Sequence, residues 1–255
     1  MEKTERDARK IFGQRAAYYS TSPAHKDTRV LNRVVLLAAP QPDWAALDIA
    51  TGSGHTAFAL APRVRLVVGT DLTPEMLAEA RRLRGDCNLA NVAFSLADVH
   101  DLPCLSGAFH LITCRRAAHH FSRIRHALSE MCRVLRPGGR VVIDDRSVPE
   151  DDFVDRCMNE LDRYHDESHV RQYRPREWRS MLEAQGFTVE AVEPYVKHRP
   201  LRAFTDGVSP ENVRRIAAVL DRLTPAQRDA LCLQDVDGEP HLNHWYVLIA
   251  AIKHN

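Results

Sequence analysis

LDIATGSGHTAFAL, residues 47–60, decides the fold of this chain. An apolar run that holds one acid, Asp48, leads into a glycine turn, and a helix-like pattern follows. Residues 52–57, GSGHTA, fit the spacing G-x-G-x-x-G/A, in which glycines let the backbone turn sharply and let a ligand approach it. Asp71 follows at about the distance expected of an acid that binds ribose hydroxyls. The turn therefore predicts a site for an adenosine-containing cofactor, and its spacing leaves both NAD and S-adenosylmethionine open.

Short apolar segments typical of strands alternate with helical patterns from about residue 44 to 145. This alternation predicts an α/β fold, in which a parallel sheet is covered by helices. Two later segments extend the sheet: FTVEAVEPYV (187–196) alternates like a strand, and HWYVLIAAIK (244–253) is apolar enough for a central strand. The earlier strands are expected over residues 45–50, 64–71, 92–98, 109–114 and 140–145.

The composition is that of an ordinary globular protein. Of 255 residues, 44% are hydrophobic and 27% are charged, which suits one large domain or two small ones. The net charge of +1 gives no electrostatic case for binding nucleic acid or an anionic membrane. The opening residues MEKTERDARK lack the apolar segment of a signal peptide, and no run approaches the roughly 18 apolar residues of a membrane span.

The six cysteines form no C-x-x-C pair, which argues against a structural zinc site. Cys114, Cys132 and Cys157 fall on expected strands or helix faces, which suits reduced, buried thiols. The expected location is therefore a reducing cytoplasm.

Acids on two strands separate the two cofactors. Asp48 lies within its strand, four residues before Gly52, and a carboxylate there would repel a pyrophosphate but would suit a sulfonium cofactor that carries an ammonium group. Asp98 ends the third strand, where its carboxylate could accept a hydrogen bond from an adenine amino group beside the Val99 N–H. The acids favour S-adenosylmethionine, and an NAD-dependent oxidoreductase is the alternative.

Four motifs together are similar to those of class I S-adenosylmethionine-dependent methyltransferases. They are D-x-x-T-G-x-G (48–54), VGTDLTPEML (68–77), A-D-x-x-D-L-P (97–103) and RVLRPGGR (133–140). The resemblance covers the whole chain, and the nearest subgroup is the type 11 small-molecule branch, which also holds quinone-biosynthesis C-methyltransferases. It implies a Rossmann-like seven-stranded sheet, mostly parallel with the last strand antiparallel, with helices on both faces and a helical lid.

The resemblance also implies which residues contact the cofactor. The glycine turn and its strand would line the methionine end, Asp71 would bind the ribose, Asp98 and Val99 would read the adenine edge, and Arg115 would face the methionine carboxylate or the substrate. The implied set is Asp48, Ala50, Thr51, Gly52, Gly54, Asp71, Leu72, Met76, Asp98, Val99 and Arg115.

Methyl transfer needs an aligned nucleophile and, for a weak one, a base, so histidine is the first candidate. His119 and His120 follow the fourth strand, in the loop where ligands bind in such folds. They are the candidate catalytic residues, although they could instead pack beneath Phe121; a metal pair is not expected, because adjacent side chains point apart. Substrate contacts are predicted for Tyr18, Tyr19, His25, His169 and Arg171.

These predictions describe one methyltransferase domain over residues 1–255, with an N-terminal cover over 1–25 and a helical lid over 150–186. The expected partner is a small-molecule acceptor, with no nucleic acid or membrane, and a homodimer is left open. The sequence does not assign the acceptor atom, because carbon, oxygen, nitrogen and sulfur acceptors all occur on this fold. A member that binds the cofactor without transferring its methyl group is a further alternative.

Overall fold

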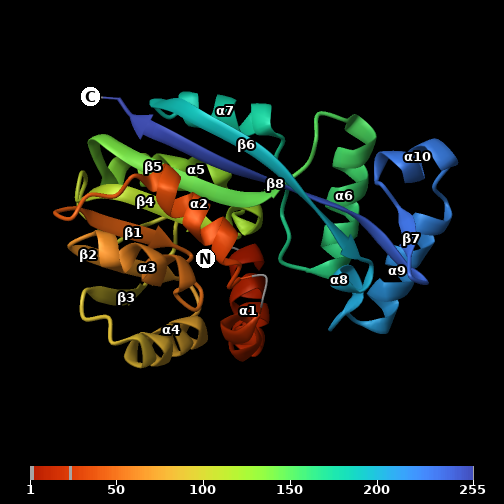
Figure 1. Cartoon of the computed structure of the whole chain (residues 1–255), viewed down its shortest axis with the longest axis horizontal. Coiled ribbons are helices and arrows are strands. Elements are labelled where there is room, and N and C mark those ends of the chain that lie inside the picture. Colours follow the sequence, from red (N-terminus) through yellow and green to blue (C-terminus); the bar gives the residue numbers. More distant parts are fainter. Residues whose placement is uncertain (1–2, 23–24, 255) are drawn as a thin grey trace.

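The structure, a computed structural model, describes the backbone of residues 3–22 and 25–254 and their side chains except those of residues 3–7 and 19. Figure 1 shows a twisted sheet that carries helices on both faces and continues, through two long strands, into a smaller helical part. No helix in these ranges is both long and apolar enough to cross a membrane.

The sheet has the predicted Rossmann-like arrangement. Its strand order is β3-β2-β1-β4-β5-β8-β6, and the neighbours up to β5 are parallel, whereas β8 runs antiparallel between β5 and β6. The short strand β7, which was not predicted, pairs only with β8 and makes the sheet eight-stranded. The strands are β1 (Ala45–Ile49), β2 (Leu66–Asp71), β3 (Val92–Leu96), β4 (Phe109–Arg115), β5 (Leu135–Ser147), β6 (Phe187–Pro200), β7 (Gln234–Val236) and β8 (Glu239–Lys253).

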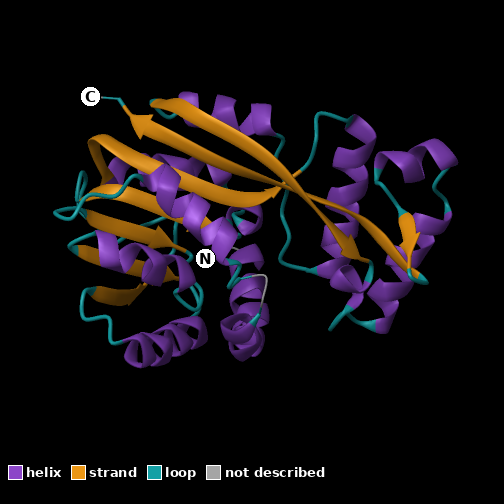
Figure 2. Ribbon diagram, in the orientation of Figure 1, coloured by secondary structure: helices purple, strands orange, loops and turns teal. Residues whose placement is uncertain are grey.

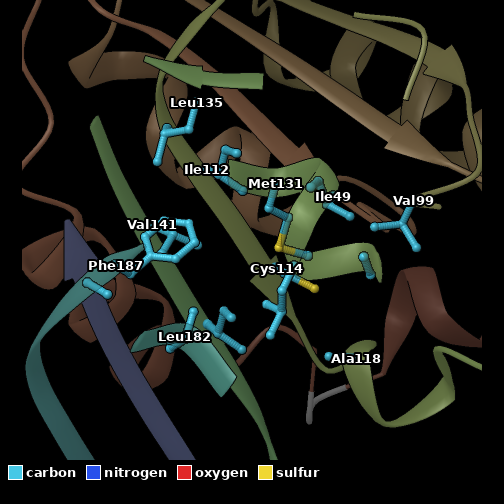
Figure 3. Packing of buried hydrophobic residues seen from close by; sticks show 14 of the residues in the cluster. Ile49, Val99, Ile112, Cys114, Ala118, Met131, Leu135, Val141, Leu182 and Phe187 are labelled. Atoms are coloured by element: carbon cyan, nitrogen blue, oxygen red, sulfur yellow. The ribbon is translucent and has the colours of Figure 1, made fainter. Parts of the chain in front are cut away.

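Helices cover the sheet because successive strand residues point to opposite faces. Ile112 of β4 packs with α5 and α7 on one face, and its neighbour Leu111 packs with α2 and α3 on the other. Figure 3 shows the first cluster, in which Met131 of α5 and Leu182 of α7 lie with side chains of the strands, among them Ile112 and Phe187. The sheet-covering helices are α2 (Thr28–Ala38), α3 (His55–Leu60), α4 (Pro74–Cys87), α5 (Ile124–Val134) and α7 (Pro175–Glu183).

A second body of helices surrounds the far ends of β6 and β8. Their own buried cluster includes Met158, Phe204, Ile216 and Leu242. We call this part the helical lobe, and Figure 2 shows the two long strands entering it. Its helices are α6 (Asp152–His165), α8 (Arg202–Thr205), α9 (Pro210–Asp221) and α10 (Pro225–Ala230).

The range 150–186, expected to form one lid, is divided between these two bodies. Helix α6 belongs to the helical lobe, whereas α7 buries Trp178, Met181 and Leu182 in the core of the main sheet. The strand predicted over FTVEAVEPYV is part of β6, but the prediction assigned the helix before it to the lid and not to the core of the sheet. The N-terminal helix α1 (Lys3–Thr21) lies beside α4, near the carboxyl ends of the parallel strands (Figure 1).

Candidate active site

A cavity lies at the carboxyl ends of β1, β2 and β4, beneath α1. We call it the first cavity. Nearly all of the residues predicted to bind the cofactor line it: Asp48, Ala50, Thr51, Gly52, Asp71, Leu72, Met76, Asp98, Val99 and Arg115. Phe12 of α1, His25, Arg116 and His120 also belong to its wall. The one predicted cofactor residue outside this wall is Gly54.

The glycine turn is built from left-handed backbone. Ala50, Gly52 and Gly54 have φ values of 49°, 54° and 88°. A Cβ on Gly54 would come within 2.7 Å of the Phe58 ring, whereas no atom lies within 4 Å of where a Cβ on Gly52 would be. Gly54 therefore shapes the start of α3, and Gly52 is the glycine that leaves room beside the backbone for a ligand.

Asp71, the last residue of β2, is held by the turn itself. Its Oδ2 accepts a hydrogen bond from Gly52 N at 2.9 Å, and its Oδ1 accepts one from Thr73 N at 2.9 Å. Burial raises the pKa of the Asp71 carboxyl above its usual value. Each carboxylate oxygen still has a lone pair for a hydroxyl donor, so the group is positioned to accept from a ribose diol.

Asp48 is the deepest acid of the first cavity, with only 1% of its surface exposed. Its carboxylate accepts hydrogen bonds from Thr51 Oγ1 at 2.6 Å and from Thr113 Oγ1 at 2.7 Å. Burial raises its pKa to about 6. A cation bound in this cavity would favour the charged form of Asp48.

Arg115 places a positive charge on the wall of the first cavity, which also carries the acid Asp48. Its Nε donates to Thr56 Oγ1 at 3.0 Å and its Nη2 to the carbonyl oxygen of His25 at 2.7 Å. Its buried Nη1 has no hydrogen-bond partner among the described residues, and burial lowers its pKa. An unpaired buried donor is costly, so this atom calls for an acceptor. Asp48 and Arg115 on one cavity thus fit the ammonium and carboxylate of an amino-acid cofactor.

Asp98 and Val99, which were predicted to read the adenine edge, line the first cavity just after β3. Oδ1 of Asp98 accepts a hydrogen bond from His100 N at 2.9 Å and lies 2.8 Å from His100 Nδ1. His100 and Thr113 were not predicted, yet they fix the two acids that were. Thr113 is opposite Asp48 in the pairing of β1 with β4, so knowledge of the strand register would have identified it.

The two adjacent histidines have different surroundings. His119 is buried; its Nδ1 lies 2.5 Å from Asp145 Oδ1, and burial lowers its pKa. His120 lines the first cavity, and its ring meets that of Phe12 edge-on with centroids 5.0 Å apart. Both histidines line a second cavity. Of these two histidines, His120 alone borders both cavities. Among the described residues, no group of three or more His, Cys, Asp or Glu side chains is arranged to hold a metal ion.

The second cavity lies between α1, the helical lobe and the far ends of β6 and β8. It shares four wall residues with the first: Phe12, His25, Arg116 and His120. A molecule in one cavity would therefore meet a molecule in the other at these side chains.

The predicted substrate contacts are only partly brought together. His25, His169 and Tyr18 line the second cavity, with Tyr18 65% exposed. Arg171 lines neither cavity: its guanidinium is held by Asp155 and Glu177, each at 3.1 Å, so the predicted contact of Arg171 is not supported. The side chain of Tyr19 lies outside the described residues.

Arg116 has a partner that the sequence did not reveal. The residue has φ 57°, and its Nε donates to the buried Asp144 at 2.9 Å. Its guanidinium stacks 3.8 Å above the ring of Tyr246. Its side chain is 12% exposed and lines both cavities.

Known proteins share both the sequence and the fold. Residues 46–139 match the family described as "Methyltransferase domain". The uncharacterized methyltransferase YcgJ of Bacillus subtilis is 31% identical over 234 residues, which are 90% of this chain and 92% of the relative. The crystal structure of YcgJ aligns with a TM-score of 0.84 over 89% of this chain and 99% of that chain.

A demethylmenaquinone methyltransferase of Thermus thermophilus is 40% identical over 119 residues, which are 46% of this chain and 54% of the relative. The alternative of an NAD-dependent oxidoreductase is not favoured by these similarities. The match over nearly the whole length of YcgJ shows that this chain belongs to the class I S-adenosylmethionine-dependent methyltransferases.

Proposed function

We propose that this methyltransferase modifies a small molecule that occupies the second cavity and presents its nucleophile at the wall shared with the first. The observation that carries the proposal is this shared wall of Phe12, His25, Arg116 and His120. The name of the demethylmenaquinone methyltransferases, which are relatives of this chain, describes an enzyme that acts on a small molecule, and this supports the proposal. The cytoplasmic location, the absence of a nucleic-acid partner and the homodimer stay predictions.

The bound cofactor supplies an electrophilic methyl group on a sulfonium. In our proposal Asp48 and Arg115 hold its amino-acid end by opposite charges, and Asp71 holds the ribose hydroxyls. Leu72, Met76 and Val99 border the adenine. These contacts orient the methyl group, and orientation is the main contribution a protein makes to an in-line displacement.

His120 is the proposed general base. The carbonyl oxygen of Ser168 lies 3.2 Å from His120 Nδ1 and only accepts hydrogen bonds, so Nδ1 carries the proton and Nε2 the lone pair. Ser168 Oγ lies 3.0 Å from the same nitrogen and donates to Asp166 Oδ1 at 2.6 Å. Although burial opposes it, nearby His120 and the bonds from Ser168 lower the pKa of Asp166 to about 2. A charged Asp166 would stabilise the imidazolium after proton uptake.

The acceptor is identified by screening small molecules with nucleophilic carbon, oxygen, nitrogen and sulfur atoms against methyl-labelled S-adenosylmethionine. Label is expected in a small molecule. Labelling of protein or nucleic acid, with none in small molecules, would contradict the proposal.

The base is tested by the pH–rate profile on that acceptor. His120→Ala is expected to lower the rate by about 10²–10⁴-fold and to remove the histidine inflection, because proton transfer is lost. His126→Ala, at an exposed position of α5, is the matched control. An unchanged profile in the His120 variant would rule out the base.

A further inference from the structure

Three arginines gather around the hydroxyl end of Tyr246, on the wall of the second cavity. Tyr246 is 2% exposed. Burial raises its pKa, but Arg116, Arg146 and Arg199 outweigh this effect, so the pKa of the phenol lies below its usual value. The Arg116 guanidinium stacks on the Tyr246 ring, and all three arginines line the second cavity.

The carboxylates nearby do not balance these cations. Arg116 is paired with Asp144 at 2.9 Å, and Arg146 with Asp162 at 2.9 Å. Burial raises the pKa of Asp162 above its usual value, whereas Arg146 favours its charged form. Arg199 has no carboxylate partner within the ranges described, and the buried Nε of Arg146 makes no hydrogen bond there. Arg146 and Arg199 are thus open to an anion.

Two nearby histidines have lowered pKa values. Burial, Arg115, Arg116 and Arg199 together lower the pKa of His25 to about 3. The pKa of His244 is likewise lowered by burial and then by Arg146 and Arg199. Both imidazoles are neutral at pH 7. Asp166 and Asp206 also line this cavity, but within the described residues neither forms an ion pair with Arg146 or Arg199.

Arg146 and Arg199 line the second cavity but not the first. They therefore lie beyond the shared wall, away from the place where the methyl group would be presented. A molecule anchored at these arginines would extend its other end toward Phe12 and His120.

We propose that the second cavity recognises a methyl acceptor by an acidic group, a carboxylate or a phosphate, bound between Arg199 and Arg146 beside Tyr246. This inference rests on the proposed function, because it treats the occupant of the cavity as the acceptor. Arginine suits the role, since its planar fork matches the geometry of carboxylate and phosphate oxygens.

The test uses the full chain with S-adenosylhomocysteine bound, and calorimetry first establishes that this ligand binds. Benzoate, its uncharged analogue benzamide and inorganic phosphate are then titrated separately. Benzoate or phosphate is expected to bind at millimolar concentration, and benzamide at least about tenfold more weakly than benzoate. Whichever of benzoate and phosphate binds more tightly shows whether the site prefers a carboxylate or a phosphate.

Arg199→Gln is expected to weaken anion binding about tenfold and to leave S-adenosylhomocysteine binding unchanged, and Arg199→Lys to keep part of the affinity. Arg215→Gln, an exposed arginine of α9 paired with Glu211, is the matched control and should have no effect. Equal binding of benzoate and benzamide, no binding of either anion, or anion binding that survives Arg199→Gln would overturn the inference. Failure of S-adenosylhomocysteine to bind would instead count against the proposed cofactor site.

Discussion

At the scale of single residues, the site depends on acids whose positions are fixed by other groups. Asp71 is oriented by two backbone N–H groups and Asp48 by two threonine hydroxyls. Preorganised carboxylates lose little entropy when a ligand binds, so each should contribute strongly to affinity.

Asp71→Asn is expected to weaken S-adenosylhomocysteine binding by about 100-fold. Each hydrogen bond from a ribose hydroxyl to a charged acceptor contributes roughly 1.5–3 kcal/mol, and the substitution removes the charge. The amide keeps the shape of the carboxylate, but its NH2 cannot accept, so the hydrogen bond from either Gly52 N or Thr73 N is lost as well. Calorimetry measures the loss, with the exposed Asp86→Asn as control. Retained affinity, or binding of NADH in place of this ligand, would refute the ribose role.

Cofactor affinity should depend on pH through Asp48. Its pKa is raised to about 6, and a bound ammonium would lower it, so the cofactor binds the charged form more tightly. Affinity is therefore constant above pH 6 and falls by up to about tenfold per unit below it. Titrations from pH 8 to 5 test this, and Asp48→Asn should bind weakly at every pH. A wild-type affinity independent of pH would contradict the ammonium contact.

At the scale of elements, α7 is part of the core. Trp178 is fully buried against the main sheet, so Trp178→Ala should lower the free energy of unfolding by about 3–5 kcal/mol. The same substitution in a helix that only covered a ligand would lower the free energy of unfolding far less. Denaturant unfolding gives the value, and Leu105→Ala, at an 83% exposed position, should change it by less than about 0.5 kcal/mol.

The sequence predicted the strands that carry the cofactor site because their signals are local. A glycine turn, an acid at a strand end and an apolar run can each be read within a few residues. The partners of those groups could not be read in this way: Thr113 reaches Asp48 only through the register of β1 and β4. Register depends on packing across the sheet, and not on any one segment.

The second cavity was foreseen less well for the same reason. Strands were expected over 187–196 and 244–253, but β6 continues to Pro200 and β8 begins at Glu239. Arg199 lies in the unpredicted end of β6, and the helical lobe is built on these extensions. Polar residues in these extensions weaken the local strand pattern, and the pairing of β6 with β8 compensates for it.

At the scale of the whole molecule, buried neutral histidines make stability depend on pH. The pKa of His165 is lowered by burial to about 4, so the unfolded chain binds a proton below about pH 6.5 that the folded chain does not. The contribution of the neutral His165 to the free energy of unfolding is present above pH 6.5 and is lost as the pH falls toward 4.

His165→Gln should therefore remove up to about 1.4 kcal/mol per pH unit of acid destabilisation between pH 6 and 4.5. Denaturant unfolding of both proteins at several pH values measures the difference in slope. His254→Gln, at an exposed position near the end of β8, is the control. Parallel pH dependences of the wild type and the His165 variant would contradict burial of a neutral imidazole.

The two long strands that join the sheet to the helical lobe constrain how the protein works. β6 and β8 are paired from Phe187 with Lys253 to Pro200 with His241, with one register shift between Val189 and Ala191, and β8 contributes to both hydrophobic bodies. A paired two-stranded ladder resists bending, so the helical lobe is not joined to the main sheet by a flexible hinge. The helix α1, which contacts α4 and η2 (Ala118–His120), contributes residues to the walls of both cavities, so reactants would have to enter beside it.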